Sequence, residues 1–241
     1  MLRVFRAIPH ERIRLVVFDL DGTLIDSTID LCNSVNATLR EFGRAELPAG
    51  QITGYIGDGA QMLVRRALFG ANEPPVHTEE ENRLLDAAMR FFLTYYRAHK
   101  LDFTYAYEGV LEALAAVEPN PAGGKRQMAG LTNKPVGPAR AICDALGLAP
   151  YLFKVYGGDS FPTKKPDPLG LNTLIEEAGA KPEETLMIGD SEVDVKTARH
   201  AGAWALGCTY GLAPHTLDEM KPDLTVDHPT DWIEALNGSQ Q

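Results

Sequence analysis

From residue 127 onward the sequence alternates short β-branched or apolar runs with segments that carry apolar residues at helical spacing. The strand-like runs span residues 127–132, 153–157, 185–188 and 203–207, and the helical segments span 137–146, 168–178 and 193–201. A further strand-like run, Ile13–Phe18, lies near the N-terminus. Strands that alternate with helices form a parallel sheet covered by helices on both faces. The sequence therefore predicts an α/β fold around one parallel sheet.

Residues 27–100 have a different character. Apolar residues recur there at helical spacing in Ser27–Phe42, Gly59–Phe69 and Glu79–His99, and no convincing strand interrupts them. We interpret this stretch as an all-helical insertion. The predicted organisation is a core of residues 1–25 and 101–241 and a helical cap domain of residues 26–100.

Composition and charge exclude several classes of protein. The formal net charge of −10 argues against nucleic acid as a partner, because phosphate backbones are held by clustered Lys and Arg. The sequence has no signal peptide and no stretch of about 18 uncharged apolar residues, so we expect no membrane partner. The first dozen residues, which include Arg3, Arg6 and Arg12, are open to interpretation as a disordered basic extension.

The three cysteines are far apart in the sequence. Cys32, Cys143 and Cys208 form no CxxC pair, which predicts neither a zinc site nor a disulfide framework. A reducing cytoplasm is therefore the expected location. The pattern leaves open whether the chain is a monomer or a homodimer.

Acidic residues directly follow the first predicted strand, in the sequence Asp19-Leu20-Asp21-Gly22. Ligands of parallel sheets bind beyond the carboxyl ends of the strands. Two carboxylates two residues apart point the same way unless the backbone turns, and Gly22 permits a turn. One acid can then attack as a nucleophile while the other moves a proton. A solvated turn is the alternative, and the position after a buried strand favours catalysis.

The next two strand ends carry groups suited to an anion. Thr132 and Asn133 can donate to phosphoryl oxygens, although the same pair also suits a turn or a helix N-cap. Lys165 lies after the third strand and directly before Pro166, which restricts the backbone. A lysine held in this way can neutralise a phosphate and a nearby carboxylate. The alternative is a pair of lysines on a solvated loop.

A third group of acids follows the fourth strand, in Gly189-Asp190-Ser191-Glu192-Val193-Asp194. Mg²⁺ typically takes one or two carboxylates together with water and substrate phosphate, and Asp190 with Asp19 would supply them. Asp194 lies one helical turn later, where it could orient a water or a lysine. The alternative is that Asp190 and Asp194 only cap the following helix.

Four motifs, in this order, resemble the haloacid dehalogenase-like hydrolase superfamily. They are Asp-Leu-Asp-Gly-Thr at 19–23, Leu-Thr-Asn-Lys at 131–134, Lys-Lys-Pro-Asp-Pro at 164–168 and Gly-Asp-Ser-Glu-Val-Asp at 189–194. The resemblance implies a Rossmann-like core, a helical cap inserted after the first motif, and an aspartyl-phosphate intermediate.

The resemblance also implies roles for individual residues. Asp19 would attack phosphorus, and Asp21 would protonate the leaving alcohol and later activate water. The main-chain carbonyl of Asp21 would join Asp19 and Asp190 in binding Mg²⁺. Thr132 and Lys165 would hold the phosphoryl group.

Two further residues complete the predicted core site. Asn133 would assist in binding the substrate, and Asp194 would support the metal site without binding the metal itself. The expected reaction is the hydrolysis of a small phosphate ester with Mg²⁺ as cofactor.

Sequence differences separate this reaction from others in the superfamily. Dehalogenases differ at the position of Asp21 because they have no leaving alcohol to protonate. Phosphonate-cleaving relatives add a Schiff-base lysine in the cap, and residues 27–98 contain no Lys. The alternatives are a sugar-phosphate phosphatase or phosphomutase of the same superfamily and, from another class, a non-catalytic binding scaffold. The intact motif set argues against the scaffold.

Three stretches, at residues 55–68, 107–111 and 157–166, resemble the phosphoglycolate phosphatases of this superfamily. In the cap, Gly57-Asp58-Gly59 is predicted to start a helix whose N-terminal amides favour an anion, such as the carboxylate of 2-phosphoglycolate. Arg65 or Arg66 would assist, and solvated arginines are the alternative. Asp58 is a negative charge at the same helix start that would compete with an anionic substrate.

Overall fold

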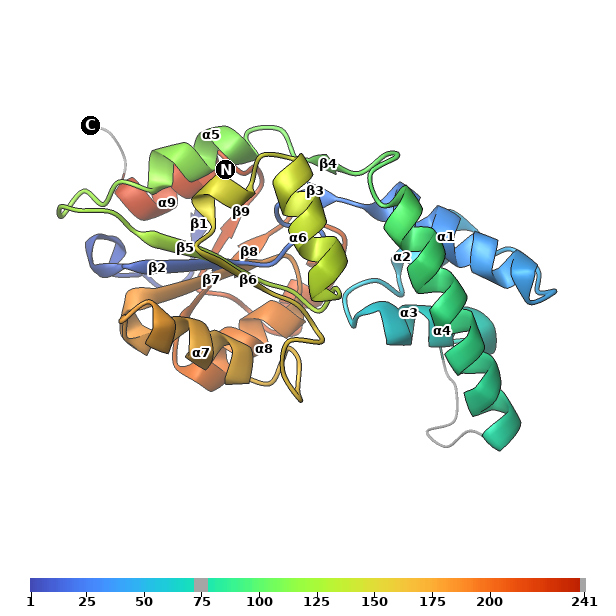
Figure 1. Ribbon diagram of the computed structural model, residues 1–241. Helices are drawn as coiled ribbons and strands as arrows, with labels where there is room; N and C mark the ends of the chain where they lie inside the picture. The colour runs from blue at the N-terminus through green and yellow to red at the C-terminus, as the bar shows by residue number, and fades with distance from the viewer. Residues whose placement is uncertain (72–77, 239–241) are drawn as a thin grey trace. The chain divides into compact units, whose positions relative to one another are not determined.

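The computed structural model describes residues 1–71 and 78–238. The chain forms two compact units (Figure 1). Unit 1 contains Met1–Asp26 and Ala106–Gln241, and unit 2 contains Ser27–Tyr105. The chain passes from one unit to the other at a two-stranded sheet of β3 (Ile25–Asp26) and β4 (Tyr105–Ala106).

Unit 1 is built around a seven-stranded sheet in the order β1-β9-β8-β7-β2-β5-β6. The strands are β1 Arg3–Val4, β2 Leu15–Phe18, β5 Gln127–Leu131, β6 Lys154–Tyr156, β7 Thr185–Gly189, β8 Trp204–Cys208 and β9 Leu224–Val226. All neighbours are parallel except β1, which is antiparallel to β9. Numbered along the chain, the parallel strands have the order 3-2-1-4-5-6 of a Rossmann-like sheet. The predicted α/β fold class is confirmed.

Helices cover both faces of this sheet. They are α5 Val110–Val117, α6 Val136–Ala145, α7 Leu169–Glu177, α8 Glu192–Ala201 and α9 Asp231–Asn237. Short 3-10 helices span His10–Arg12, Ala149–Tyr151, Pro182–Glu184 and Pro214–Asp218. Figure 1 shows α5, α6 and α9 on one face and α7 and α8 on the other.

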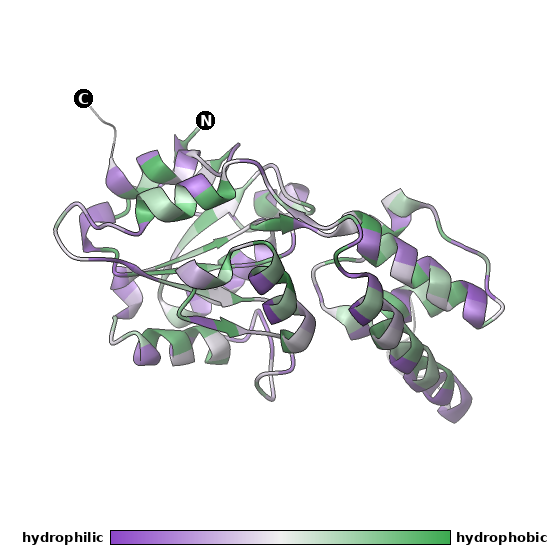
Figure 2. Cartoon of the chain, turned by 45° about the horizontal axis from the view of Figure 1, so that its top comes forward, coloured by the Kyte–Doolittle hydropathy of each residue, from purple (hydrophilic) through white to green (hydrophobic). Residues whose placement is uncertain are grey.

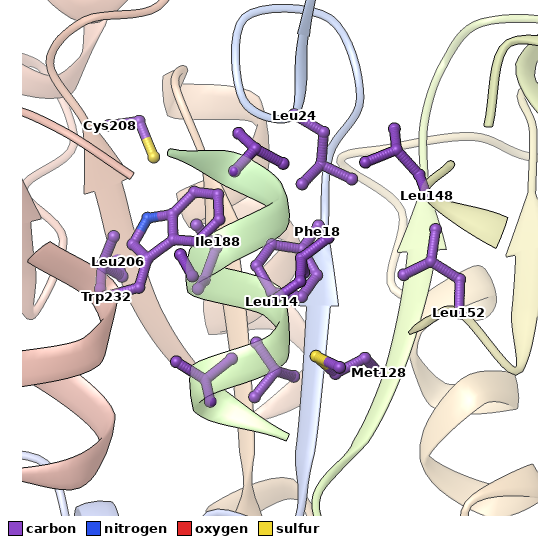
Figure 3. Close-up of a cluster of buried hydrophobic side chains, with 14 of the residues drawn as sticks. Phe18, Leu24, Leu114, Met128, Leu148, Leu152, Ile188, Leu206, Cys208 and Trp232 are labelled. Atoms are coloured by element: carbon purple, nitrogen blue, oxygen red, sulfur yellow. The ribbon is translucent and has the colours of Figure 1, made fainter. Parts of the chain in front are cut away.

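The central strand β2 is buried along its whole length between β5 and β7. Successive side chains of a strand point to opposite faces of its sheet. Val16 and Phe18 accordingly pack in the core that includes α5, α6 and α9, whereas Leu15 and Val17 pack in the core with α7 and α8. Figure 3 shows the first core, where the ring centroids of Phe18 and Trp232 are 5.2 Å apart. Burial on both faces explains the continuous apolar run and holds rigid the strand that leads to Asp19.

The described part of unit 2 consists of helices and loops, apart from Tyr105, the first residue of β4. Its helices are α1 Thr28–Glu41, α2 Ala49–Thr53, α3 Ala60–Phe69 and α4 Glu79–His99. These helices carry both hydrophilic and hydrophobic residues (Figure 2), and they enclose a core of their own that includes Val35, Ile52, Val64 and Phe92. Among the residues that the structure describes, no helix combines the length and apolarity needed to cross a bilayer.

A buried carboxylate joins the two ends of unit 2. Asp30, in the first turn of α1, is 1% exposed. Its side chain accepts hydrogen bonds from the backbone N–H groups of Phe103 and Thr104 and from the Thr104 hydroxyl. The segments through which the chain enters and leaves the unit are thereby held side by side.

The N-terminal residues form part of unit 1, so their interpretation as a disordered extension is wrong. Arg3–Val4 adds β1 to the edge of the sheet, and Arg6 Nε lies 2.5 Å from Asp223 Oδ1. Asp223 is 1% exposed and also accepts hydrogen bonds from the Arg199 guanidinium and from the N–H of Ala205. A two-residue strand is too short to show the alternation by which strands are recognised in a sequence.

Replacing Asp223 by Asn is expected to lower the melting temperature at neutral pH by about 5 °C or more. Burial alone would raise the pKa of Asp223, but hydrogen bonds from Arg199 and Arg6 outweigh it and hold this pKa below the ordinary value of 3.8. A carboxyl with a lowered folded pKa stabilises the fold above its unfolded pKa, and this stabilisation is lost as pH falls through the folded pKa. Thermal unfolding from neutral pH to about pH 3 should therefore show the two proteins converging in acid. A difference that is constant with pH would contradict the assignment.

Candidate active site

The carboxyl ends of β2, β5 and β7 are adjacent because these strands are neighbours in the sheet. In a sheet of this order, the crevice for a ligand lies where the strand order reverses, which is between β2 and β7 here. The predicted core residues follow these strands directly or lie in the loop after β6 and at the start of α8. They are Asp19, Asp21, Thr132, Asn133, Lys165, Asp190 and Asp194, and all belong to unit 1.

Lys165 bridges two carboxylates. Its Nζ lies 2.8 Å from Asp19 Oδ1 and 2.6 Å from Asp194 Oδ1. The residue is only 5% exposed. Burial would lower the pKa of this ammonium, but Asp19 and Asp194 outweigh burial and raise the pKa above its ordinary value. Lys165 is therefore a fixed positive charge beside the predicted nucleophile. The peptide bond between Lys165 and Pro166 is cis.

Asp194 both caps a helix and holds the lysine. Its Oδ2 accepts hydrogen bonds from the Ser191 hydroxyl at 2.8 Å and the Ser191 N–H at 3.2 Å, at the start of α8, while its Oδ1 contacts Lys165. Gly189 makes room for this arrangement, because a Cβ there would lie 2.1 Å from Asp194 Cγ. The two interpretations of Asp194, as a helix cap and as a group that orients a lysine, describe the same side chain.

Asp21 pairs with a second lysine, which the sequence analysis did not select as a site residue. Lys134 Nζ lies 2.7 Å and 2.9 Å from the two carboxylate oxygens of Asp21. Lys134 is 5% exposed. Its position directly after Thr132 and Asn133, at the end of a strand adjacent to β2, is the signal that could have identified it.

Thr132 and Asn133 are both buried at the end of β5. The Thr132 hydroxyl oxygen accepts a hydrogen bond from the N–H of Lys134 at 3.3 Å. The Asn133 side-chain amide donates to the Lys165 carbonyl at 3.2 Å. Asn133 thus connects the loop after β5 to the loop that carries Lys165.

Asp190 is held by the backbone of a loop that the sequence analysis did not connect with the site. Its Oδ2 accepts hydrogen bonds from the N–H of Leu212 at 2.6 Å and of Ala213 at 3.0 Å, after β8. Burial, together with the charges of Asp194 and Asp19, raises the pKa of Asp190 to about 8. Burial also raises the pKa of Asp19 to about 6, although Lys165 opposes the shift. In both carboxyls, the cost of burying the ionised form exceeds the stabilisation that neighbouring donors and positive charges provide.

These residues fit a divalent cation. Carboxylate oxygens of Asp19, Asp190 and Asp194 all lie within 4.8 Å of one another. With Asp21 they make four carboxylates against two buried lysines, so two negative charges remain when every group is ionised. One Mg²⁺ would balance them, and carboxylate oxygens are ligands that it prefers. Asp194 uses one oxygen on Lys165 and the other on Ser191, whereas Asp19 contacts Lys165 through Oδ1, so Asp19 and Asp190 are the better-placed ligands.

The predicted cap residues belong to unit 2. Gly57, Asp58 and Gly59 precede α3, Gly59 is its N-cap, and Arg65 lies within the helix. Asp58 Oδ2 lies 2.6 Å from Arg66 Nη2. Arg66 therefore balances the carboxylate that the sequence analysis identified as a competitor for an anionic substrate.

Comparison with known proteins gives matches over most of the chain. A family model described as haloacid dehalogenase-like hydrolase matches residues 13–202. The sequence is 39% identical over 226 residues to phosphoglycolate phosphatase 1 of Pseudomonas aeruginosa, and this match covers 93% of this chain and 80% of the relative. It is also 38% identical over 218 residues to the phosphoglycolate phosphatase of Pseudomonas putida, and this match covers 89% of this chain and 76% of the relative.

A solved structure is similar over nearly the whole fold. The crystal structure of a predicted phosphoglycolate phosphatase from Haemophilus somnus superposes with a TM-score of 0.81 at 30% sequence identity. The match covers 92% of this chain and 97% of the other. The resemblance on which the sequence analysis relied is thus confirmed.

Proposed function

The chain belongs to the haloacid dehalogenase-like hydrolase family, and from this premise we propose that it is a Mg²⁺-dependent phosphatase whose main substrate is 2-phosphoglycolate. The observation that carries the proposal is the contact between Asp19 and Lys165 at the end of a buried strand. Asp190 lies close to Asp19, and Asp21 follows Asp19 by two residues. Relatives named phosphoglycolate phosphatase, at 36–39% identity, support the substrate.

In the first chemical step, an Asp19 carboxylate oxygen attacks phosphorus. The bond between phosphorus and the leaving oxygen breaks, an acyl phosphate forms on Asp19, and Asp21, which enters this step in its protonated form, gives its proton to the departing alkoxide. In the second step, Asp21 takes a proton from water, and the hydroxide attacks the phosphorus of the acyl phosphate. Inorganic phosphate leaves, and the Asp19 carboxylate is restored.

The surrounding residues position these groups and stabilise charge. Lys165 fixes Asp19 and adds a positive charge where the phosphoryl group binds, and Lys134 holds both oxygens of Asp21. The Thr132 hydroxyl supplies a further donor for phosphoryl oxygens. Asp19 and Asp190, with the main-chain carbonyl of Asp21, would hold Mg²⁺, which when bound neutralises charge on the phosphoryl oxygens.

Selection of the substrate's carboxylate is assigned to the cap. Gly57, Asp58 and Gly59 lead into α3, whose N-terminal amides favour an anion. Since Arg66 balances Asp58, the start of this helix is not net negative, and Arg65 adds a positive charge in its second turn.

The test is phosphate release from a panel that contains 2-phosphoglycolate, a hexose monophosphate, a nucleoside monophosphate and p-nitrophenyl phosphate, with Mg²⁺ or with a chelator. We expect kcat/KM to be highest for 2-phosphoglycolate and activity to fall at least about 100-fold with chelator. Arg65→Ala should raise KM for 2-phosphoglycolate more than for p-nitrophenyl phosphate, which has no carboxylate.

Other outcomes would change the proposal in defined ways. Turnover spread evenly over the panel would retain the mechanism and reject 2-phosphoglycolate as the substrate. Release of phosphate only transiently from a hexose phosphate would indicate a phosphomutase. No release from any ester by the folded protein would reject the phosphatase and favour a binding scaffold.

A further inference from the structure

The segment Tyr210–Ala213 follows β8 and contacts two of the loops that build the site. We call this segment the β8 loop. One of the two contacted loops is the nucleophile loop, Asp19–Thr23, and the other contains Asp190. The β8 loop contains none of the four motifs on which the family resemblance rests.

The first contact orients a carboxylate. The N–H groups of Leu212 and Ala213 both donate to Oδ2 of Asp190, at 2.6 Å and 3.0 Å. Two donors on one oxygen fix the rotation of the carboxyl group. Partners of this kind behind a metal ligand set its geometry and its affinity for the metal.

The second contact fixes the nucleophile loop. The Tyr210 hydroxyl donates a hydrogen bond of 2.9 Å to the carbonyl of Thr23, the last residue of that loop. The Tyr210 ring also packs edge-on against Tyr107, with the centroids 5.1 Å apart. The hydroxyl is therefore presented from a ring that is itself held in place.

The third contact lies between the two loops. A Cβ on Gly211 would lie 2.3 Å from the Gly22 carbonyl oxygen and 2.3 Å from Asp190 Cβ. Gly211 is not among the glycines with positive φ, so its backbone conformation suits any residue. Glycine is required at position 211 by space alone, because the chain there lies close to both Gly22 and Asp190.

We propose that the β8 loop is a positioning element of the active site, which sets the placement of Asp190 relative to the nucleophile loop. This inference rests on the proposed function, in which Asp19 and Asp190 share one Mg²⁺. A displacement of either loop by a few tenths of an ångström changes the distance between the two ligands. Tyr210 and Gly211 are the positioning residues, and they act through Thr23, Gly22 and Asp190 rather than by touching the substrate.

The test compares Tyr210→Phe and Gly211→Ala with two matched controls. Tyr156→Phe also removes one tyrosine hydroxyl bond, to Glu177. Gly137→Ala adds a methyl group where nothing lies within 4 Å. Each protein is titrated with Mg²⁺ alone by calorimetry, melted in the absence of metal, and assayed for phosphate release.

Both loop variants should bind Mg²⁺ about tenfold or more weakly and show a similar fall in kcat, while the controls match the wild type. KM at saturating Mg²⁺ should change little, because the loop does not bind substrate. Without metal, Tyr210→Phe should melt within a few degrees of the wild type. If Tyr210 only stabilised the fold, weakened Mg²⁺ binding would come with a lowered melting temperature.

Unchanged Mg²⁺ affinity in Tyr210→Phe would overturn the inference, and this variant decides alone if Gly211→Ala does not fold. A wild type that binds no Mg²⁺ would overturn it as well. If the wild type binds Mg²⁺ but releases no phosphate, the proposed function fails, and the affinities of the variants still decide the role of the loop.

Discussion

Replacing Asp19 by Asn is expected to reduce phosphate release by about 10⁴-fold or more, because an amide oxygen cannot form the acyl phosphate. The loss should appear in kcat for every substrate, since the same atom attacks each one. Rapid acid quenching with labelled substrate should trap phosphate on the wild-type chain and none on the variant. Asp144→Asn, which neutralises an exposed carboxylate in the same unit, should retain wild-type activity and serves as the control.

The loss should not come from unfolding. Burial raises the pKa of Asp19 to about 6, so the folded state disfavours the ionised form, and a neutral side chain removes this cost at neutral pH. Without metal, the variant should therefore melt no lower than the wild type. Retention of more than about a hundredth of the activity would place the nucleophile at another residue.

Replacing Lys165 by Met is expected to abolish activity and also to destabilise the fold by about 3–5 kcal/mol at neutral pH. The methionine keeps most of the length of the side chain but removes the ammonium between Asp19 and Asp194. These two buried carboxylates would then lack their shared cation. Breaking a buried ion pair in this way costs more than the loss of an exposed one, because a charge is left buried without a partner.

The pH dependence of this variant separates charge from packing. Without the lysine, which opposes the shift, burial raises the pKa of Asp19 further, so the variant regains stability as pH falls and this carboxyl takes up a proton. Denaturant unfolding in a chelator at neutral and mildly acidic pH measures the effect. Lys164→Met, at the exposed neighbouring position, is the matched control and should change the free energy of unfolding by less than about 1 kcal/mol, because contacts of an exposed lysine contribute little. A Lys165→Met protein as stable as the wild type at neutral pH would contradict the role assigned to this contact.

Elements with a clear local pattern could be predicted from the sequence. The helical spacing in residues 79–99 predicts α4, Glu79–His99, with the same bounds. The run at Ile13–Phe18 predicts β2, and the topology of parallel sheets then predicts which strand ends meet. The pattern of strands therefore predicts that Asp19 and Asp190 lie together at one edge of the sheet.

The remaining features have no such pattern. The pair of Asp21 with Lys134 depends on side-chain directions at two neighbouring strand ends. The contact of Asp190 with the β8 loop uses backbone N–H groups, which every residue except proline offers, so no residue type marks it. β1 and α9 were not assigned, because one is a two-residue strand and the other a seven-residue helix, both too short for a clear period.

The position of β2 in the sheet also determines the order in which the protein can assemble during synthesis. Leu15 pairs with Gln127 on one side and with Thr185 on the other, so both neighbours of β2 are made long after it. Unit 2, by contrast, is one continuous segment, and its helices are complete before β5 leaves the ribosome. Domains made early generally fold first, while an apolar strand without partners is a site of aggregation. The reactive Asp19 is thus synthesised long before the residues that surround it, and its surroundings are complete only once Ala213 has been added.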